Sequence, residues 1–231
     1  MRAKGTADVA ATVIIPVKNG GALLRQSLEA VIAQKTTFPF EVLCIDSGST
    51  DDSVSTIESS GARLYQIPSH QFGHGKTRNL GVSLSQTPFV ALITQDAIPS
   101  TDLWLEELIQ PFRYDDTLAG VFGPHQPHED CRATERFMLE RHFAQFGTEN
   151  VTWRIGSNPR SWSDYAARRD FFCFFSDNNA ALRRSVWERI PYRDVEFMED
   201  QLWAAAALEA GYAKAFAARA AVRHSHNYDT I

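Results

Sequence analysis

Short apolar segments alternate with helical segments through the first half of the chain, and this alternation limits the fold more than any other feature. Residues 12–16 (TVIIP) and 41–45 (EVLCI) read as strands, and residues 21–34 between them carry apolar side chains at helical spacing. Further strands are expected at 63–67, 89–94 and 118–122, with helices at 52–60, 75–86 and 101–112. Apolar strands separated by helices predict an α/β fold with a mostly parallel sheet and helices on both faces.

The second half of the chain is less regular. Its pattern predicts a polar, aromatic-rich loop over 147–170, helices at 134–146, 184–189 and 200–210, and strands at 179–183 and 213–222. No repeat and no Gly/Ser- or Pro-rich linker divides the 231 residues. We therefore expect one domain over 1–231.

Composition and charge argue against several functional classes. The net charge of −5 is not that of a general nucleic-acid-binding protein. The three cysteines, Cys44, Cys131 and Cys173, lack the spacing of a metal site and suit a reducing cytoplasm. The N-terminus is too polar for a signal peptide, and no apolar run approaches the ~18 residues of a membrane span. These features predict a cytoplasmic globular protein.

Polar residues follow the predicted strands where those strands end. The runs are PVKN at 16–19, DSGS at 46–49, QDA at 95–97 and HSH at 224–226. Because ligands bind at the carboxyl ends of strands in open α/β sheets, we expect a site there. Neither GxGxxG nor GxxxxGK[ST] follows the first strand, which argues against a dinucleotide cofactor and against a P-loop. The acidic and polar run suits a metal ion and a phosphorylated ligand.

Five segments carry a family resemblance. VIIPVKNGG, LCIDSGSTDDS, TQDA, MEDQLWAAAALEAG and HSHNYD resemble, in order and spacing, the inverting nucleotide-sugar glycosyltransferases of family 2, which have the GT-A fold. FGHGKTRNLG together with TQDAIP is similar, more narrowly, to the bacterial rhamnosyltransferases. The resemblance implies that residues 11–123 bind the nucleotide sugar, and that residues 124–231 hold the acceptor and the catalytic groups.

The resemblance also implies which residues bind the donor. Those expected to contact the nucleotide are Pro16, Val17, Lys18, Asn19, Asp46, Ser47 and Gln95. Lys76 and Arg78, at the start of a predicted helix, are expected to bind the diphosphate together with the helix N-terminal amides. Two alternatives stay open: a turn role for Asp46, and a solvated basic turn for Lys76 and Arg78.

A metal ion and a general base complete the implied site. Asp96 corresponds to the metal-binding carboxylate of the family and is expected to hold Mn²⁺ or Mg²⁺ on the diphosphate. Its neighbours Gln95 and Ala97 are not acidic, so His224 or His226 is expected to add a ligand, with a surface role as the alternative. Asp200 is expected to take the proton from the acceptor hydroxyl, and a helix N-cap is its alternative role.

The implied reaction is inverting transfer of a sugar from a dTDP- or UDP-sugar to a glycan or lipid-linked acceptor in cell-surface polysaccharide synthesis. By resemblance the sugar is L-rhamnose from dTDP-rhamnose. A lipid-linked acceptor is compatible with peripheral association at the inner face of the cytoplasmic membrane. Two alternatives remain: a sugar-1-phosphate nucleotidyltransferase, which the single basic residue of VKNGG disfavours, and a non-catalytic nucleotide-sugar-binding scaffold, which Asp96 and Asp200 disfavour.

Overall fold

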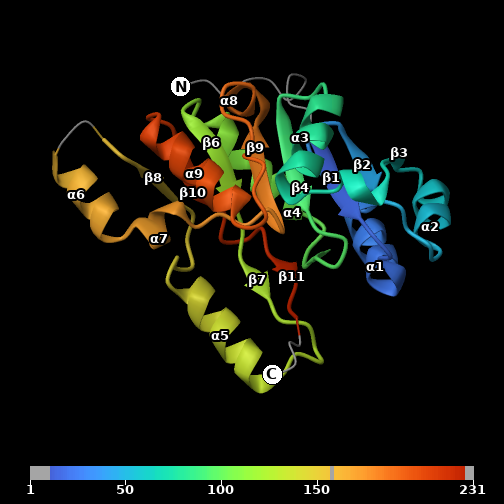
Figure 1. Cartoon of the computed structure of the whole chain (residues 1–231). Helices are drawn as coiled ribbons and strands as arrows, with labels where there is room; N and C mark the ends of the chain where they lie inside the picture. The colour runs from blue at the N-terminus through green and yellow to red at the C-terminus, as the bar shows by residue number, and fades with distance from the viewer. Residues whose placement is uncertain (1–10, 157–158, 227–231) are drawn as a thin grey trace.

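The computed structural model describes residues 11–156 and 159–226. Its main strands are β1 (Ala11–Val17), β2 (Phe40–Asp46), β3 (Arg63–Gln66), β4 (Phe89–Ile93), β6 (Leu118–Phe122), β8 (Val151–Arg154), β9 (Asn179–Arg183) and β10 (Ala213–Phe216). They form one sheet in the order β3-β2-β1-β4-β9-β6-β10-β8. Three short strands, β5 (Ile98–Pro99), β7 (His125–Gln126) and β11 (Val222–Arg223), form a second sheet in the order β5-β11-β7. Figure 1 shows β7 and β11 beside each other.

Helices cover both faces of the main sheet. They are α1 (Gly21–Ile32), α2 (Ser53–Ser60), α3 (His74–Leu84), α4 (Trp104–Ile109), α5 (Ala133–Ala144), α6 (Pro159–Ala167), α7 (Arg169–Cys173), α8 (Arg184–Trp187) and α9 (Glu199–Glu209), with 3₁₀ turns η2 (Ser69–Gln71) and η3 (Gln110–Arg113). Within the described ranges, no helix is both long and apolar enough to cross a bilayer.

Alternate side chains of the central strands enter two separate cores. Val13 and Ile15 of β1 pack with α1, α2 and α4, whereas Ile14 packs with α3, α8 and α9. Because successive side chains of a strand point to opposite faces, a strand buried on both faces is apolar at most of its positions. This burial explains the continuous apolar runs in the sequence, and it confirms the predicted α/β class.

The sheet is mixed rather than fully parallel. Strands β1, β2, β3 and β4 are parallel, but β9 lies antiparallel between β4 and β6, and β8 lies antiparallel to β10. The chain leaves the sheet after β6, and β9 then inserts between two strands that precede it in sequence. The strands of the two halves of the chain therefore interleave in one sheet.

Two expectations for the second half are wrong. Residues 147–170 are not one loop, because they include β8 and α6, and Trp153 of β8 packs against Phe122 and Phe146. The strand expected at 213–222 is broken into β10 and β11. The carboxamide of Asn179 donates to the Ala220 carbonyl at 2.7 Å, so this part of the chain turns toward Asn179 instead of continuing the ladder.

Candidate active site

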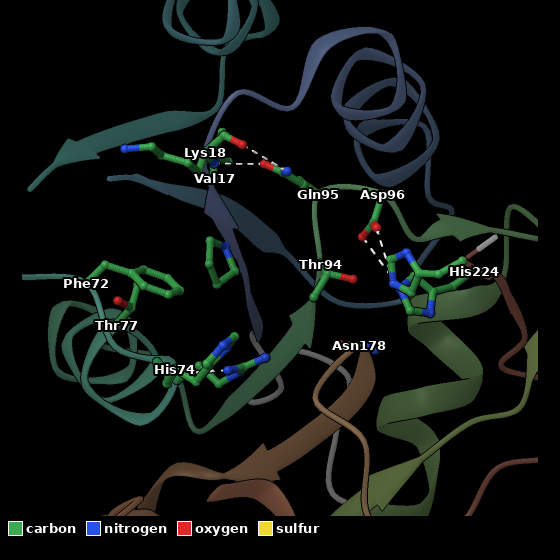
Figure 2. Close-up of a pocket in the computed structure, with 13 residues that line it drawn as sticks. Val17, Lys18, Phe72, His74, Thr77, Thr94, Gln95, Asp96, Asn178 and His224 are labelled. Carbon is green, nitrogen blue, oxygen red and sulfur yellow. Dashed lines mark hydrogen bonds and ion pairs between the residues drawn. The ribbon is translucent and has the colours of Figure 1, made fainter. Parts of the chain in front are cut away.

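The carboxyl ends of β1 and β4 meet the start of α3 and the segment after β11 around one cavity of about 280 Å³ (Figure 2). The cavity is lined by Pro16, Val17, Lys18, Phe72, His74, Thr77, Arg78, Thr94, Gln95, Asp96, Asn178, His224 and His226. Most of the residues predicted from strand ends therefore share one site. Five predicted residues lie outside this lining: Asn19, Asp46, Ser47, Lys76 and Asp200.

Asp96, His224 and His226 form a candidate metal site at one side of the cavity. The Asp96 carboxylate oxygens lie 3.6 Å from Nε2 of His224 and 3.8 Å from Nε2 of His226. One ligand atom from each residue falls within 4.8 Å of the other two. Two ligand atoms at ~2.1 Å from one divalent ion lie at most about 4.2 Å apart, and the distances from Asp96 to both histidines meet this limit. The residues present therefore fit the expected metal, with both histidines in place of a second carboxylate.

The charges of this trio also suit a cation. Burial alone would raise the pKa of Asp96, but hydrogen bonding and charge from His224 hold that pKa well below its usual value. Burial lowers the pKa of His226, aided by the charge of His224. Metal ligation requires an ionised carboxylate and neutral imidazoles, and the shifts favour the ionised form of Asp96 and the neutral form of His226.

Secondary contacts position the trio. The backbone amide of His224 donates to the Gln126 carbonyl at 2.9 Å, and Nε2 of His128 lies 3.2 Å from the main-chain oxygen of Asp96. Sequence reasoning did not assign His128 to this site. In the sequence, His128 stands out only as part of the HQPH segment at 125–128, and this segment does not show that His128 reaches Asp96.

Gln95 clamps the end of β4 to the end of β1. The Lys18 amide donates to Oε1 of Gln95 at 2.8 Å, and Nε2 of Gln95 donates to the Lys18 carbonyl at 3.1 Å. Both polar atoms of the Gln95 side chain are therefore engaged by backbone. This glutamine shapes the cavity wall, and its direct contact with a nucleotide stays a prediction.

Asp46, Ser47 and Asn19 join the loop after β1 to the loop after β2. The Asp46 carboxylate is fully buried and accepts hydrogen bonds from the Gly48 and Ser49 amides at 3.1 and 3.2 Å. The Ser47 hydroxyl donates to the Val17 carbonyl at 3.0 Å. Asn19 Oδ1 accepts from the Thr50 amide at 2.8 Å. The turn role that was left open for Asp46 is present, and nucleotide binding by these side chains stays a prediction.

Lys76 and Arg78 are not brought together. Lys76 is exposed and pairs with Asp194 at 3.0 Å, away from the cavity lining. Arg78 is buried: its Nη1 donates to Glu199 at 2.6 Å, and its Nε lies 3.0 Å from Oδ2 of Asp177. The alternative that was left open, a solvated basic turn, is therefore wrong for Arg78. Each of the two cations already has a carboxylate partner, so their contact with a diphosphate stays a prediction.

Asp200 belongs to the buried cluster around Arg78. Oδ2 of Asp200 accepts from the Asp177 amide at 3.3 Å, and Tyr192 donates its hydroxyl hydrogen to Asp177 at 2.8 Å. Burial, followed by the charge of Glu199, raises the pKa of Asp200 to about 6. Burial also raises the pKa of Asp177 to about 8, although the charge of Arg78 opposes the shift.

This cluster gives Asp200 the character of a base. One cation faces three carboxylates, so a proton is readily held among them. The N-cap of α9 is Met198, not Asp200, so the predicted capping alternative is wrong. Sequence reasoning missed Asp177. Its only signal was the polar run SDNN between an aromatic segment and a strand.

Comparison with known proteins identifies the family of this chain. Residues 12–190 match the family model of glycosyl transferase family 2. The chain is 35% identical over 222 residues to the O-antigen chain rhamnosyltransferase RfbN of Salmonella typhimurium, covering 94% of this chain and 67% of that protein. It thus spans about two thirds of the length of that relative.

Solved structures show the same fold. Residues 1–349 of TarS from S. aureus, in complex with UDP-GlcNAc, align with a TM-score of 0.72 and 16% identity, covering 96% of this chain and 60% of that one. A mannosyltransferase of Pyrobaculum calidifontis, in complex with GDP-Man and Mn²⁺, aligns with a TM-score of 0.66 and 18% identity, covering 93% and 56%. These likenesses confirm the predicted GT-A type of fold.

Proposed function

Because this chain belongs to glycosyltransferase family 2, we propose that it transfers L-rhamnose from dTDP-rhamnose, with inversion, to a glycan or lipid-linked acceptor. The observation that carries the proposal is the trio of Asp96, His224 and His226 at the cavity where β1 and β4 end. The choice of rhamnose rests on the similarity to a rhamnosyltransferase. A cytoplasmic location, at the inner membrane face when the acceptor is lipid-linked, belongs to the same proposal.

Mn²⁺ is the preferred metal of this proposal. Two of the three candidate ligands are imidazoles, which suit Mn²⁺ better than the smaller, harder Mg²⁺. The similar mannosyltransferase structure contains Mn²⁺. A bound divalent ion supplies positive charge where the departing diphosphate becomes more negative.

Asp200 has the proton-accepting role in this mechanism. The acceptor hydroxyl transfers its proton to the Asp200 carboxylate while the acceptor oxygen bonds to the anomeric carbon and the bond to the diphosphate breaks. A base with a pKa of about 6 is ionised at neutral pH and still able to hold a proton. The Asp177 amide and the Gln201 amide, 2.7 Å from Oδ1, hold the carboxylate in place.

Titration calorimetry with dTDP, UDP and GDP, each with and without Mn²⁺, tests the proposal. We expect Mn²⁺-dependent binding of dTDP. Asp96→Asn should weaken it by about 10- to 100-fold or more, because the ionised ligand is lost. The matched control is Asp102→Asn, an exposed carboxylate paired with Lys35, which should bind as wild type does.

The other outcomes separate the alternatives. Preference for UDP or GDP would keep the family and discard rhamnose. Folded protein that binds none of the nucleotides would favour the scaffold. Release of pyrophosphate from dTTP and a sugar 1-phosphate would identify a nucleotidyltransferase instead.

A further inference from the structure

Three exposed aromatic side chains gather beside the cavity. Phe72 is 41% exposed and Phe197 is 69% exposed. The ring of His74 contacts both, with centroids 5.2 Å from Phe72 and 6.5 Å from Phe197. We call Phe72, His74 and Phe197 the aromatic rim. Exposed apolar groups that cluster, rather than scatter, indicate a binding surface.

The aromatic rim borders a hollow of about 450 Å³ that lies beside the cavity. Phe72 and His74 line both spaces. Figure 2 shows these two side chains across the cavity from Asp96 and His224. The hollow is also lined by Lys76, Asp194 and Glu196, so it combines aromatic faces with charged groups.

The loop that carries Phe197 is held in place. Gly75 of α3 lies so close to the Arg193 carbonyl that a β-carbon there would overlap it, and Lys76 ties the loop through Asp194. Met198 has a φ of 66°, and among the described residues only Asn19 is another non-glycine residue with positive φ. A left-handed methionine is strained by ~1 kcal/mol or more and persists where surrounding contacts hold it.

The same loop leads directly to the proposed base. Met198 precedes α9, and Asp200 is the second residue of that helix. Phe197 therefore stands three residues before the carboxylate that would accept the acceptor proton. The hollow lined by Phe197 therefore lies beside the start of α9.

We propose that the aromatic rim and its hollow bind the acceptor as a saccharide. A pyranose ring has an apolar C–H face, which packs on an aromatic ring, and hydroxyl groups at its edge. Lys76, Asp194 and Glu196 offer donors and acceptors for those hydroxyls. An acyl chain in the same place would displace water from these three charged groups without supplying hydrogen bonds in its place. The proposal rests on the transferase function, since it assigns the acceptor side of that site.

Saturation-transfer NMR on the full chain with dTDP and Mn²⁺ tests this assignment. The probes are the methyl α-D-glycosides of glucose, galactose, mannose and N-acetylglucosamine, together with n-octyl β-D-glucopyranoside. We expect transfer to the ring protons of at least one glycoside. Phe197→Ala and Phe72→Ala should each weaken its binding about two- to tenfold, the range for loss of one aromatic contact.

The matched control is Phe137→Ala. Phe137 is 61% exposed on α5 and lies outside both spaces, so this variant should bind the glycosides as wild type does. Because all three phenylalanines are exposed, loss of the core is not expected in any variant.

Three results would overturn the assignment. The first is glycoside binding by both rim variants that equals binding by wild type. The second is no saturation transfer to any glycoside from protein that binds dTDP. The third is saturation transfer to the alkyl chain of octyl glucoside without saturation transfer to its ring. A failure of the proposed transferase function would give a different result. If wild type binds the glycosides through Phe197 and Phe72 but binds no nucleotide, the rim stands and the transferase proposal falls.

Discussion

Replacing Asp200 with asparagine is expected to stabilise the protein while it removes transfer activity. Burial and the charge of Glu199 raise the pKa of Asp200 from 3.8 to about 6. At ~1.36 kcal/mol per pKa unit, the ionised carboxylate lowers the free energy of unfolding at neutral pH by about 2–3 kcal/mol. The asparagine carboxamide can still accept the hydrogen bond from the Asp177 amide.

The pH dependence of this effect has a definite sign. Between pH 3.8 and about 6, the folded wild type retains a proton that the unfolded chain has lost, so its stability falls as the pH rises. Asp200→Asn has no such proton. Its advantage over wild type should therefore grow across this window and stay constant above it.

Urea denaturation at pH 4.5, 6 and 8, followed by fluorescence of the buried Trp104 and Trp203, measures the effect. Glu58→Gln is the control, because that carboxylate is exposed on α2 and its loss should change stability by less than ~0.5 kcal/mol. Transfer by Asp200→Asn should fall about 10²- to 10⁴-fold with nucleotide binding intact. A variant no more stable than wild type at pH 8, or an advantage independent of pH, would refute the reasoning.

Three further predictions concern the metal, the buried cation and the loop contact. Because burial lowers the pKa of His226 from 6.5, calorimetric Mn²⁺ affinity should hold from pH 8 to about 6.5 and weaken below; a decline beginning above pH 7 would contradict this lowered pKa. Arg78→Met leaves two buried carboxylates without their cation, so urea denaturation should show a loss of about 3–5 kcal/mol. It should also raise the pKa of Asp200 and move the acidic limb of the pH–activity profile upward; a downward move would refute the charge argument. Gly75→Ala should lower the free energy of unfolding by about 1–3 kcal/mol through backbone overlap, whereas Gly73→Ala, which meets only a flexible lysine side chain, should be tolerated; equal effects would show that the close approach is not needed.

The sequence alone was enough to predict the α/β class, the strands β1, β2, β4 and β6, and a polar cavity where β1 and β4 end. These features depend on local patterns, since a strand buried on both faces is apolar at most of its positions. Asp96 was identifiable for a related reason, because a residue shortly after a central parallel strand lies at the carboxyl end of the sheet.

Only the tertiary structure determined what the charged groups contact. His224 and Asp96 are far apart in sequence, and they meet because β11 pairs with β5, directly after Asp96. Arg78, predicted to bind the diphosphate at the start of a helix, lies in a buried carboxylate cluster, and Asp177 joins that cluster without a distinctive motif. Burial and the distances between charges set a side chain's pKa and its partners, and both arise from segments remote in the chain. A residue's type and position in the sequence therefore predict that it can ionise, whereas the packed fold decides which charge it faces and how readily it holds a proton.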